Sequence, residues 1–219
     1  ILNLPEILLN KLLIMKKLIL YTLLLFVSFS YGQKKELRNA NKFYTSGEYS
    51  SALDLLDSSK SLFDSSDDKI KSQVMLLYGK IHTSMEDFSL AIKAFDMSRN
   101  MGISNQILSP ELSKLETAII TSAVGDNETE NFSEAAKKLK MVYDINPEIN
   151  QEYLYYAASS AVNSMDYNLA LEYYLLLGDI KYEGIETKFY ITEVASGSEI
   201  EINSETEFNL LKKSKDYSN

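Results

Sequence analysis

The chain contains no cysteine, no tryptophan and a single histidine, His82. Without cysteine it has no disulfide, no thiolate metal ligand, no cysteine nucleophile and no lipid attached through a thiol. One imidazole cannot build the usual zinc sites, which draw on several histidine or cysteine ligands. We therefore expect no metal and no cofactor, and we expect His82 to fill a packing position on a helix rather than to act as a general base.

Proline and glycine are also scarce, with three and eight copies among 219 residues. Because these residues punctuate turns, their scarcity favours helices over a turn-rich β-sandwich. The formal net charge is −9, from 31 acidic and 22 basic residues. Nucleic-acid-binding proteins concentrate Lys and Arg on one face, and the sequence displays no such stripe. The composition predicts an all-α protein that does not bind nucleic acid.

The segment from Met15 to Gly32 has the form of a secretory signal peptide. Two lysines follow Met15, then about 12 mostly apolar residues, then small residues at positions 30 and 32. This pattern predicts cleavage after Gly32. A membrane anchor is the alternative, but the apolar run is well short of the ~20 residues that span a bilayer. We expect an exported protein, periplasmic, associated with the outer envelope or secreted, with no integral membrane span after cleavage.

The residues Ile1–Ile14 precede a plausible initiator methionine, and we expect them to carry no fold. Residues 1–32 are thus interpreted as an upstream extension plus signal peptide, and residues 33–182 as the main domain.

Four segments of the main domain align with one another. Each has an aromatic residue followed three positions later by an alanine, and the alanines lie at 52, 91, 135 and 170. Small residues allow two helices to approach closely, and aromatic residues fill the space beside them. The residues assigned to this packing are Ala40, Gly47, Tyr49, Ala52, Gly79, Phe88, Ala91, Phe95, Phe132, Ala135, Ala158, Tyr167, Ala170 and Tyr174.

These segments resemble tetratricopeptide repeats, a family with a period of about 34 residues. The resemblance implies a right-handed α-solenoid of about four helix hairpins, of the type found in bacterial exported proteins. The third copy is partial, and Glu86, Glu130 and Met165 stand where the family has a turn glycine. The resemblance also implies a concave groove for peptides, lined by Asn41, Tyr44, Lys80, Thr83, Tyr155, Ser159 and Val162.

Local signals suggest where several helices begin and end. Ser109 and Pro110 have the form of an N-cap followed by a first-turn proline, and Gly102 and Gly178 have the form of C-terminal caps. The longer intervals between repeats are assigned to loops at Asp64–Lys69 and Gly125–Asn131.

Residues 183–219 have a different pattern. Residues 188–194 are rich in β-branched and aromatic side chains, residues 195–198 are turn-like and residues 199–203 alternate, which predicts a β-hairpin. Ser204 and Glu207 have capping-box spacing before a short apolar stretch. We interpret the segment as a hairpin and short helix inserted in a further repeat, and we expect the natural chain to continue past Asn219.

The pattern favours a non-catalytic scaffold or adaptor that binds a peptide or protein partner. The alternative is a structural, self-assembling subunit of an envelope complex, and an enzyme using His82 or a carboxylate pair is the least favoured reading. The acids Asp64, Asp67 and Asp68 lack the spacing of a calcium loop. The fourth segment is crowded with tyrosines, and any that are exposed would suit partner binding. The identity of the partner and the oligomeric state are left open.

Overall fold

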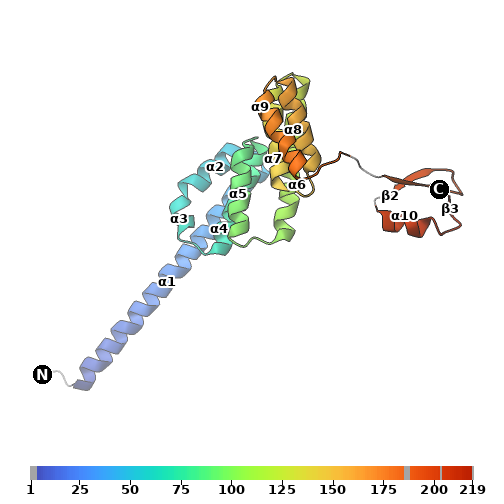
Figure 1. Ribbon diagram of the computed structural model, residues 1–219. Helices are drawn as coiled ribbons and strands as arrows, with labels where there is room; N and C mark the ends of the chain where they lie inside the picture. The colour runs from blue at the N-terminus through green and yellow to red at the C-terminus, as the bar shows by residue number, and fades with distance from the viewer. Residues whose placement is uncertain (1–3, 185–187, 203, 219) are drawn as a thin grey trace. The chain divides into compact units, whose positions relative to one another are not determined.

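The computed structural model (Figure 1) describes residues 4–184, 188–202 and 204–218, except for the side chains of residues 4–10, 19–31 and 205. The chain divides into two compact units, residues 1–176 and 177–219. The first unit is helical and the second carries a small antiparallel sheet. The expectation of a mostly helical protein with a β-hairpin near its C-terminus is therefore confirmed.

The helices of the first unit follow one another with short connections. Their bounds are α1 Leu4–Thr45, α2 Tyr49–Ser58, α3 Lys60–Asp64, α4 Asp68–Ser84, α5 Phe88–Asn100, α6 Asn105–Glu128, α7 Phe132–Ile145, α8 Gln151–Asn163 and α9 Tyr167–Asp179.

Four turns in this unit share one geometry. Gly47, Glu86, Glu130 and Met165 each have a positive φ, between 61° and 80°. In each turn the next residue donates its amide to a carbonyl five positions back, for example Asp87 to His82 at 2.9 Å and Asp166 to Ala161 at 3.0 Å. This bond satisfies a carbonyl left open by the preceding helix. The turns therefore join α1 to α2, α4 to α5, α6 to α7 and α8 to α9 in the same way.

The helix that follows each turn begins at an aromatic residue. Tyr49, Phe88, Phe132 and Tyr167 are the first residues of α2, α5, α7 and α9. The aligned alanines then occupy the fourth position of each helix and are almost completely buried, with 0 to 3% exposure. An alanine at this position allows the paired helices to approach closely.

The core runs through the first unit as a series of clusters. One cluster joins α1, α2, α3 and α4, and includes Ala40, Ala52 and Leu77. A second joins α5, α6 and α7 around Phe95, Leu115 and Val142. A third joins α7, α8 and α9 through Ala136, Ala161 and Ala170. Each helix pair thus buries apolar surface against the next pair.

The remaining packing residues have different environments. Gly79, Phe88, Phe95 and Ala158 are buried, and Phe132 is half-buried.

Tyr167 and Tyr174 differ from the expectation, because they are 66% and 41% exposed. In unit 1 α9 is the last helix, so no later helix of that unit covers its outer side.

The start of α6 differs from the sequence-based expectation. The helix begins at Asn105, with Ser104 as its N-cap, and Pro110 lies inside it. Proline has no amide hydrogen and disfavours helical interiors. However, Leu108 is 1% exposed within the core. Because burial of Leu108 stabilises this segment as a helix, the helix begins more than one turn before the proline. The Ser109–Pro110 boundary was therefore wrong.

Three other boundaries also differ. The expected loop at Asp64–Lys69 is reduced to residues 65–67, because α3 ends at Asp64 and α4 begins at Asp68. Gly125 belongs to α6, which continues to Glu128, so the expected loop at 125–131 is reduced to its last three residues. Gly178 lies within α9, and Lys181 adopts the left-handed conformation after that helix, with φ of 55°. Gly102 does follow α5 with φ of 89°, as expected of a C-terminal cap.

The predicted signal segment lies within α1, which begins at Leu4. The expectation that Ile1–Ile14 carry no fold is therefore wrong for residues 4–14, which are helical. The side chains of most of its apolar stretch are outside the described residues, and residues 11–18 are exposed. Gln33, the residue after the predicted cleavage site, is 6% exposed, and its Nε2 donates to the Leu62 carbonyl at 3.1 Å. Among the side chains that the structure describes, no helix has the length and apolar character needed to cross a membrane.

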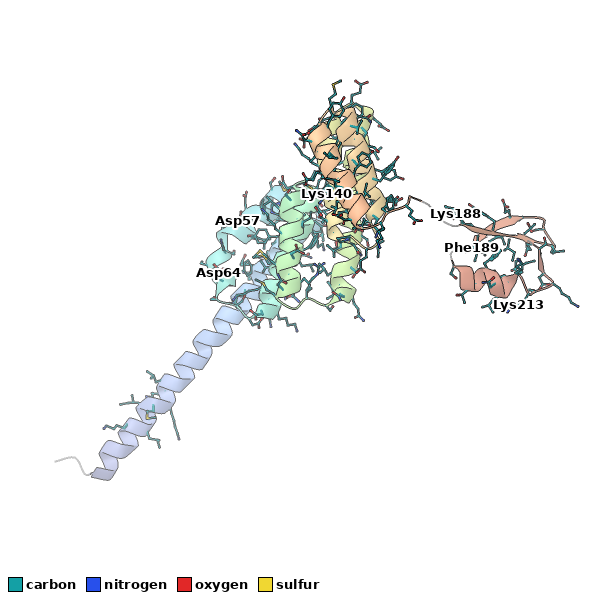
Figure 2. All side chains as sticks on the ribbon, viewed as in Figure 1. Asp57, Asp64, Lys140, Lys188, Phe189 and Lys213 are labelled. Carbon is teal, nitrogen blue, oxygen red and sulfur yellow. The ribbon has the colours of Figure 1, made fainter. Side chains whose placement is uncertain are left out.

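The second unit contains β1 Phe189–Glu193, β2 Glu199–Ile202, α10 Glu205–Leu211 and β3 Tyr217–Ser218. β1 pairs antiparallel with β2, with Ile191 opposite Ile200, and β3 adds to the other side of β1. The third strand was not predicted. Ser204 caps α10 by accepting from the Glu207 amide at 3.2 Å. Phe208 packs on Phe189 with ring centroids 5.1 Å apart, and Phe189 is labelled on the second unit in Figure 2. Asn203 lies outside the described residues.

Candidate partner-binding cleft

A cleft of about 710 Å³ opens between α1, α4 and the start of α6. Residues 34, 37, 38 and 41 of α1 line one side, and they recur at helical spacing on one face. Residues 69, 70, 73, 76, 77 and 80 of α4 line the opposite side. Ile103 and Ile107 close the cleft where the chain enters α6. The cleft is thus built from the first helices of three successive pairs.

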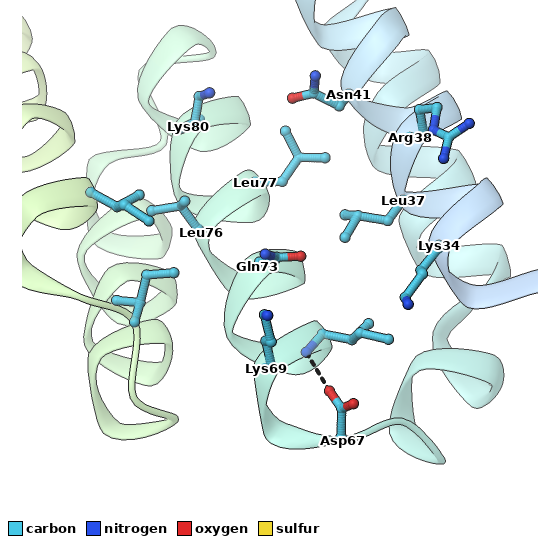
Figure 3. Close-up of a pocket in the computed structure, with 13 residues that line it drawn as sticks. Lys34, Leu37, Arg38, Asn41, Asp67, Lys69, Gln73, Leu76, Leu77 and Lys80 are labelled. Atoms are coloured by element: carbon cyan, nitrogen blue, oxygen red, sulfur yellow. Dashed lines mark hydrogen bonds between the residues drawn. The ribbon is translucent and has the colours of Figure 1, made fainter. Parts of the chain in front are cut away.

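The floor of the cleft is apolar. Leu77 is 3% exposed and belongs to the core cluster beneath the cleft, and Leu37 packs against the same cluster. Figure 3 shows Leu37 and Asn41 pointing from α1 toward α4, and Leu77 pointing back toward α1. An occupant would therefore meet aliphatic side chains below and polar groups above.

The rim of the cleft is basic. Lys34, Arg38, Lys69 and Lys80 line it, against one carboxylate, Asp67. That carboxylate is already engaged, because its Oδ1 accepts from the Ile70 amide at 2.8 Å and caps α4 (Figure 3). Within the described ranges no carboxylate forms an ion pair with any of the four cations. The cleft carries positive charge in a chain whose net charge is −9.

Three of the expected groove residues come together here. Asn41 and Lys80 line the cleft, and the Lys80 ammonium lies over the Tyr44 ring, 4.7 Å from its centroid. This cation–π contact holds the lysine at the rim. The fourth expected residue, Thr83, donates its hydroxyl to the Gly79 carbonyl at 2.8 Å, so the threonine is bonded to its own helix.

Lys114 of α6 lies outside the cleft lining and borders a separate hollow with Ser113, Thr117 and Ala118. Its ammonium donates to Glu111 at 3.0 Å, and this bond raises the pKa of Lys114, with a smaller contribution from Tyr44.

The other expected groove residues lie on α8 and do not line this cleft. Ser159 lines a separate hollow of about 530 Å³ formed by α6, α7 and α8. Tyr155 and Val162 are 45% and 40% exposed. Tyr155 contacts Tyr156 and Tyr174 through ring edges, with centroids 5.9 and 6.5 Å apart. The sequence therefore grouped residues that the structure divides between two places.

His82 lies outside the cleft lining, in a separate hollow formed by α2, α3, α4 and α5. Its side chain is 12% exposed, and its ring stacks on Tyr78 at 6.2 Å. The Tyr78 hydroxyl donates to Asp57 at 2.6 Å, and burial together with this carboxylate raises the pKa of Tyr78. His82 Nδ1 lies 3.5 Å from Asp87. In the part of the chain that the structure describes, no three acidic or histidine side chains gather as a metal site.

Sequence reasoning missed most of the cleft. Lys34, Arg38, Lys69 and Gln73 were not singled out, because the family pattern assigns positions within one hairpin and does not say which side chains face one another across hairpins. A signal was present in Lys34, Arg38 and Asn41, which recur at i, i+4 and i+7 on one helix face. Comparison of the chain with protein-family models, curated proteins and solved structures gives no match.

Proposed function

We propose that this protein is a non-catalytic scaffold of the tetratricopeptide-repeat type, which holds a peptide or protein partner against the first helices of its hairpins. The observation that carries the proposal is the cleft between α1, α4 and α6. It spans three successive helix pairs, and it offers an apolar floor below a polar rim. Pockets that bind ligands combine these two features.

The four equivalent turns support a repeat architecture. A single helix pair cannot bury its apolar face alone, so stacked pairs share a core and leave one face free for a partner. The proposal therefore includes the solenoid arrangement expected from the sequence. It also includes export with removal of residues 1–32, which an observed mature N-terminus at Gln33 would support.

The test is site-specific photo-crosslinking in the cells that make the protein. A photoreactive residue at Gln73, in the cleft, should capture a partner protein. The same residue at Ser89, on the exposed side of α5, serves as the matched control and should capture none. Equal capture from both positions, or capture from position 89 alone, would remove the cleft from the proposal.

A structural, self-assembling role is favoured by one observation. The outer face of α9 exposes Tyr167, Leu171 and Leu175, each by 59% or more. An uncovered apolar stripe of this kind is typical of association surfaces. Sedimentation that shows a monomer at every protein concentration would argue against this role.

A further inference from the structure

The charge of the cleft is opposite to that of the chain. The sequence has nine more acidic than basic residues, yet four cations and one carboxylate line the cleft. Asp67 is engaged in capping α4. The local field at the cleft therefore favours an anionic group, even though the molecule as a whole repels polyanions.

The cations are distributed along the cleft. Lys69 and Lys80 are eleven residues apart on α4, which corresponds to about 16 Å along a helix. Lys34 and Arg38 lie on adjacent turns of α1, on the opposite side. An extended peptide rises about 3.3 Å per residue, so roughly five residues would pass between these charges.

The neutral groups of the cleft suit a polypeptide. Gln73 and Asn41 supply amide donors and acceptors for a peptide backbone, and Leu37, Leu76 and Leu77 offer a surface for an aliphatic side chain. A nucleic acid strand would instead call for several aromatic stacking surfaces beside the cations. The described lining contains none, and the one neighbouring ring, Tyr44, has its face against the Lys80 ammonium.

We propose that the occupant of the cleft is an acidic segment of a partner protein. The segment binds extended, with at least two carboxylates between the α1 and α4 cations and an aliphatic side chain on the leucine floor. This inference rests on the function proposed above and adds the chemistry of the partner.

The experiment uses the full chain and a displayed library of short random peptides. Peptides that the protein selects should be enriched in Asp and Glu relative to the input library. The tightest peptide is then synthesised with its acids intact and with each acid replaced by its amide. Fluorescence anisotropy should show binding weakened at least about tenfold by the amide replacements and by raising salt from about 50 to about 300 mM.

Two double variants separate the cleft from general charge. Lys69→Gln with Lys80→Gln removes two cleft cations and should weaken binding of the acidic peptide about tenfold. Lys93→Gln with Lys137→Gln makes the same change in net charge on α5 and α7 and should alter binding less than about twofold. Equal thermal unfolding of the two proteins establishes that both are folded.

Several outcomes would overturn the inference. These are selection of neutral or basic peptides, equal losses in the two double variants, or tighter binding of a single-stranded oligothymidylate than of the selected peptide. Crosslinking at position 73 alongside any of these results would leave the scaffold function in place and remove only the acidic partner. If that crosslink is absent and the cleft variants bind the peptide as tightly as the unaltered protein does, both the scaffold function and the acidic partner are ruled out.

Discussion

At the scale of the single residue, the left-handed backbone conformation at the turns lowers the free energy of unfolding. Glu86, Glu130 and Met165 adopt the conformation that Gly47 adopts in the first turn. A side chain in this region costs about 1–2 kcal/mol relative to glycine. The hydrogen bonds that close the turns, and the burial of the following helix, keep these residues in place.

This cost leads to a prediction at Met165. The side chain is 76% exposed, so Met165→Gly removes strain without opening a cavity. We expect the free energy of unfolding to rise by about 0.5–1 kcal/mol, after the greater freedom of glycine in the unfolded chain is allowed for. Urea denaturation with an unchanged m-value would measure the gain.

The neighbouring position supplies the control. Ser164 has φ of −78°, and Ser164→Gly should lower stability because no strain is relieved there. Gly47→Ala should also lower it, by about 1 kcal/mol. If Met165→Gly and Ser164→Gly changed the free energy of unfolding in the same direction, the strain argument would fail.

At the scale of the element, α4 and α5 meet at a position that admits no side chain. A Cβ added at Gly79 would lie 2.4 Å from the Phe95 ring, and Phe95 is 1% exposed. The ring cannot move aside, because it is enclosed by the core of α5, α6 and α7. The two helices are also joined by a buried hydrogen bond from Ser98 to the Ser72 carbonyl at 2.7 Å.

We predict that Gly79→Ala destabilises the protein by about 1–3 kcal/mol, the usual cost of overpacking a core. Phe95→Leu is destabilising by itself, but in its presence Gly79→Ala should cost at least about 1 kcal/mol less, because the smaller side chain makes room. A double-mutant cycle by denaturant unfolding measures this coupling. Additive effects would show that the clash is relieved elsewhere.

The elements also show what the sequence could and could not predict. The helix pairs were predictable because Ala52, Ala91 and Ala170 each follow an aromatic residue by a fixed interval, and that interval is set within one hairpin. The start of α6 was not predictable from the sequence. The burial of Leu108 depends on tertiary packing, which outweighs the local signal of Pro110.

The cleft was less predictable than the helices. Its lining depends on how three helices face one another, and a pattern within one hairpin carries no such information. Asn41 and Lys80 line the cleft and Tyr44 lies beside Lys80, whereas their role in holding a partner stays a prediction. Tyr155 and Val162 were grouped with them on family positions alone, and the structure places them on α8.

At the scale of the whole molecule, the first unit distributes its packing unevenly. α4 contacts α1, α2, α3, α5 and α6, and most of its apolar side chains are buried. α9 packs through Ala170 and Leu169 against α7 and α8, while its outer face is exposed. In the repeat architecture that we propose, stability is close to a sum over hairpins and their interfaces. An end hairpin with one neighbour then opens at a lower free energy than an inner hairpin with two.

We therefore predict that amide hydrogens in the middle of α9 exchange at least about tenfold faster than those in the middle of α4 under native conditions, because local opening of the last hairpin leaves the inner core intact. Hydrogen exchange resolved by mass spectrometry would measure the difference. Leu154→Ala, in the core of α8, should increase the difference in exchange rate between α9 and α4, because it weakens the last hairpin. Ile81→Ala, in the core of α4, should decrease that difference. Equal protection of α4 and α9 in all three proteins would mean that the helices unfold as one cooperative block, in which the exposed side of α9 has no bearing on stability.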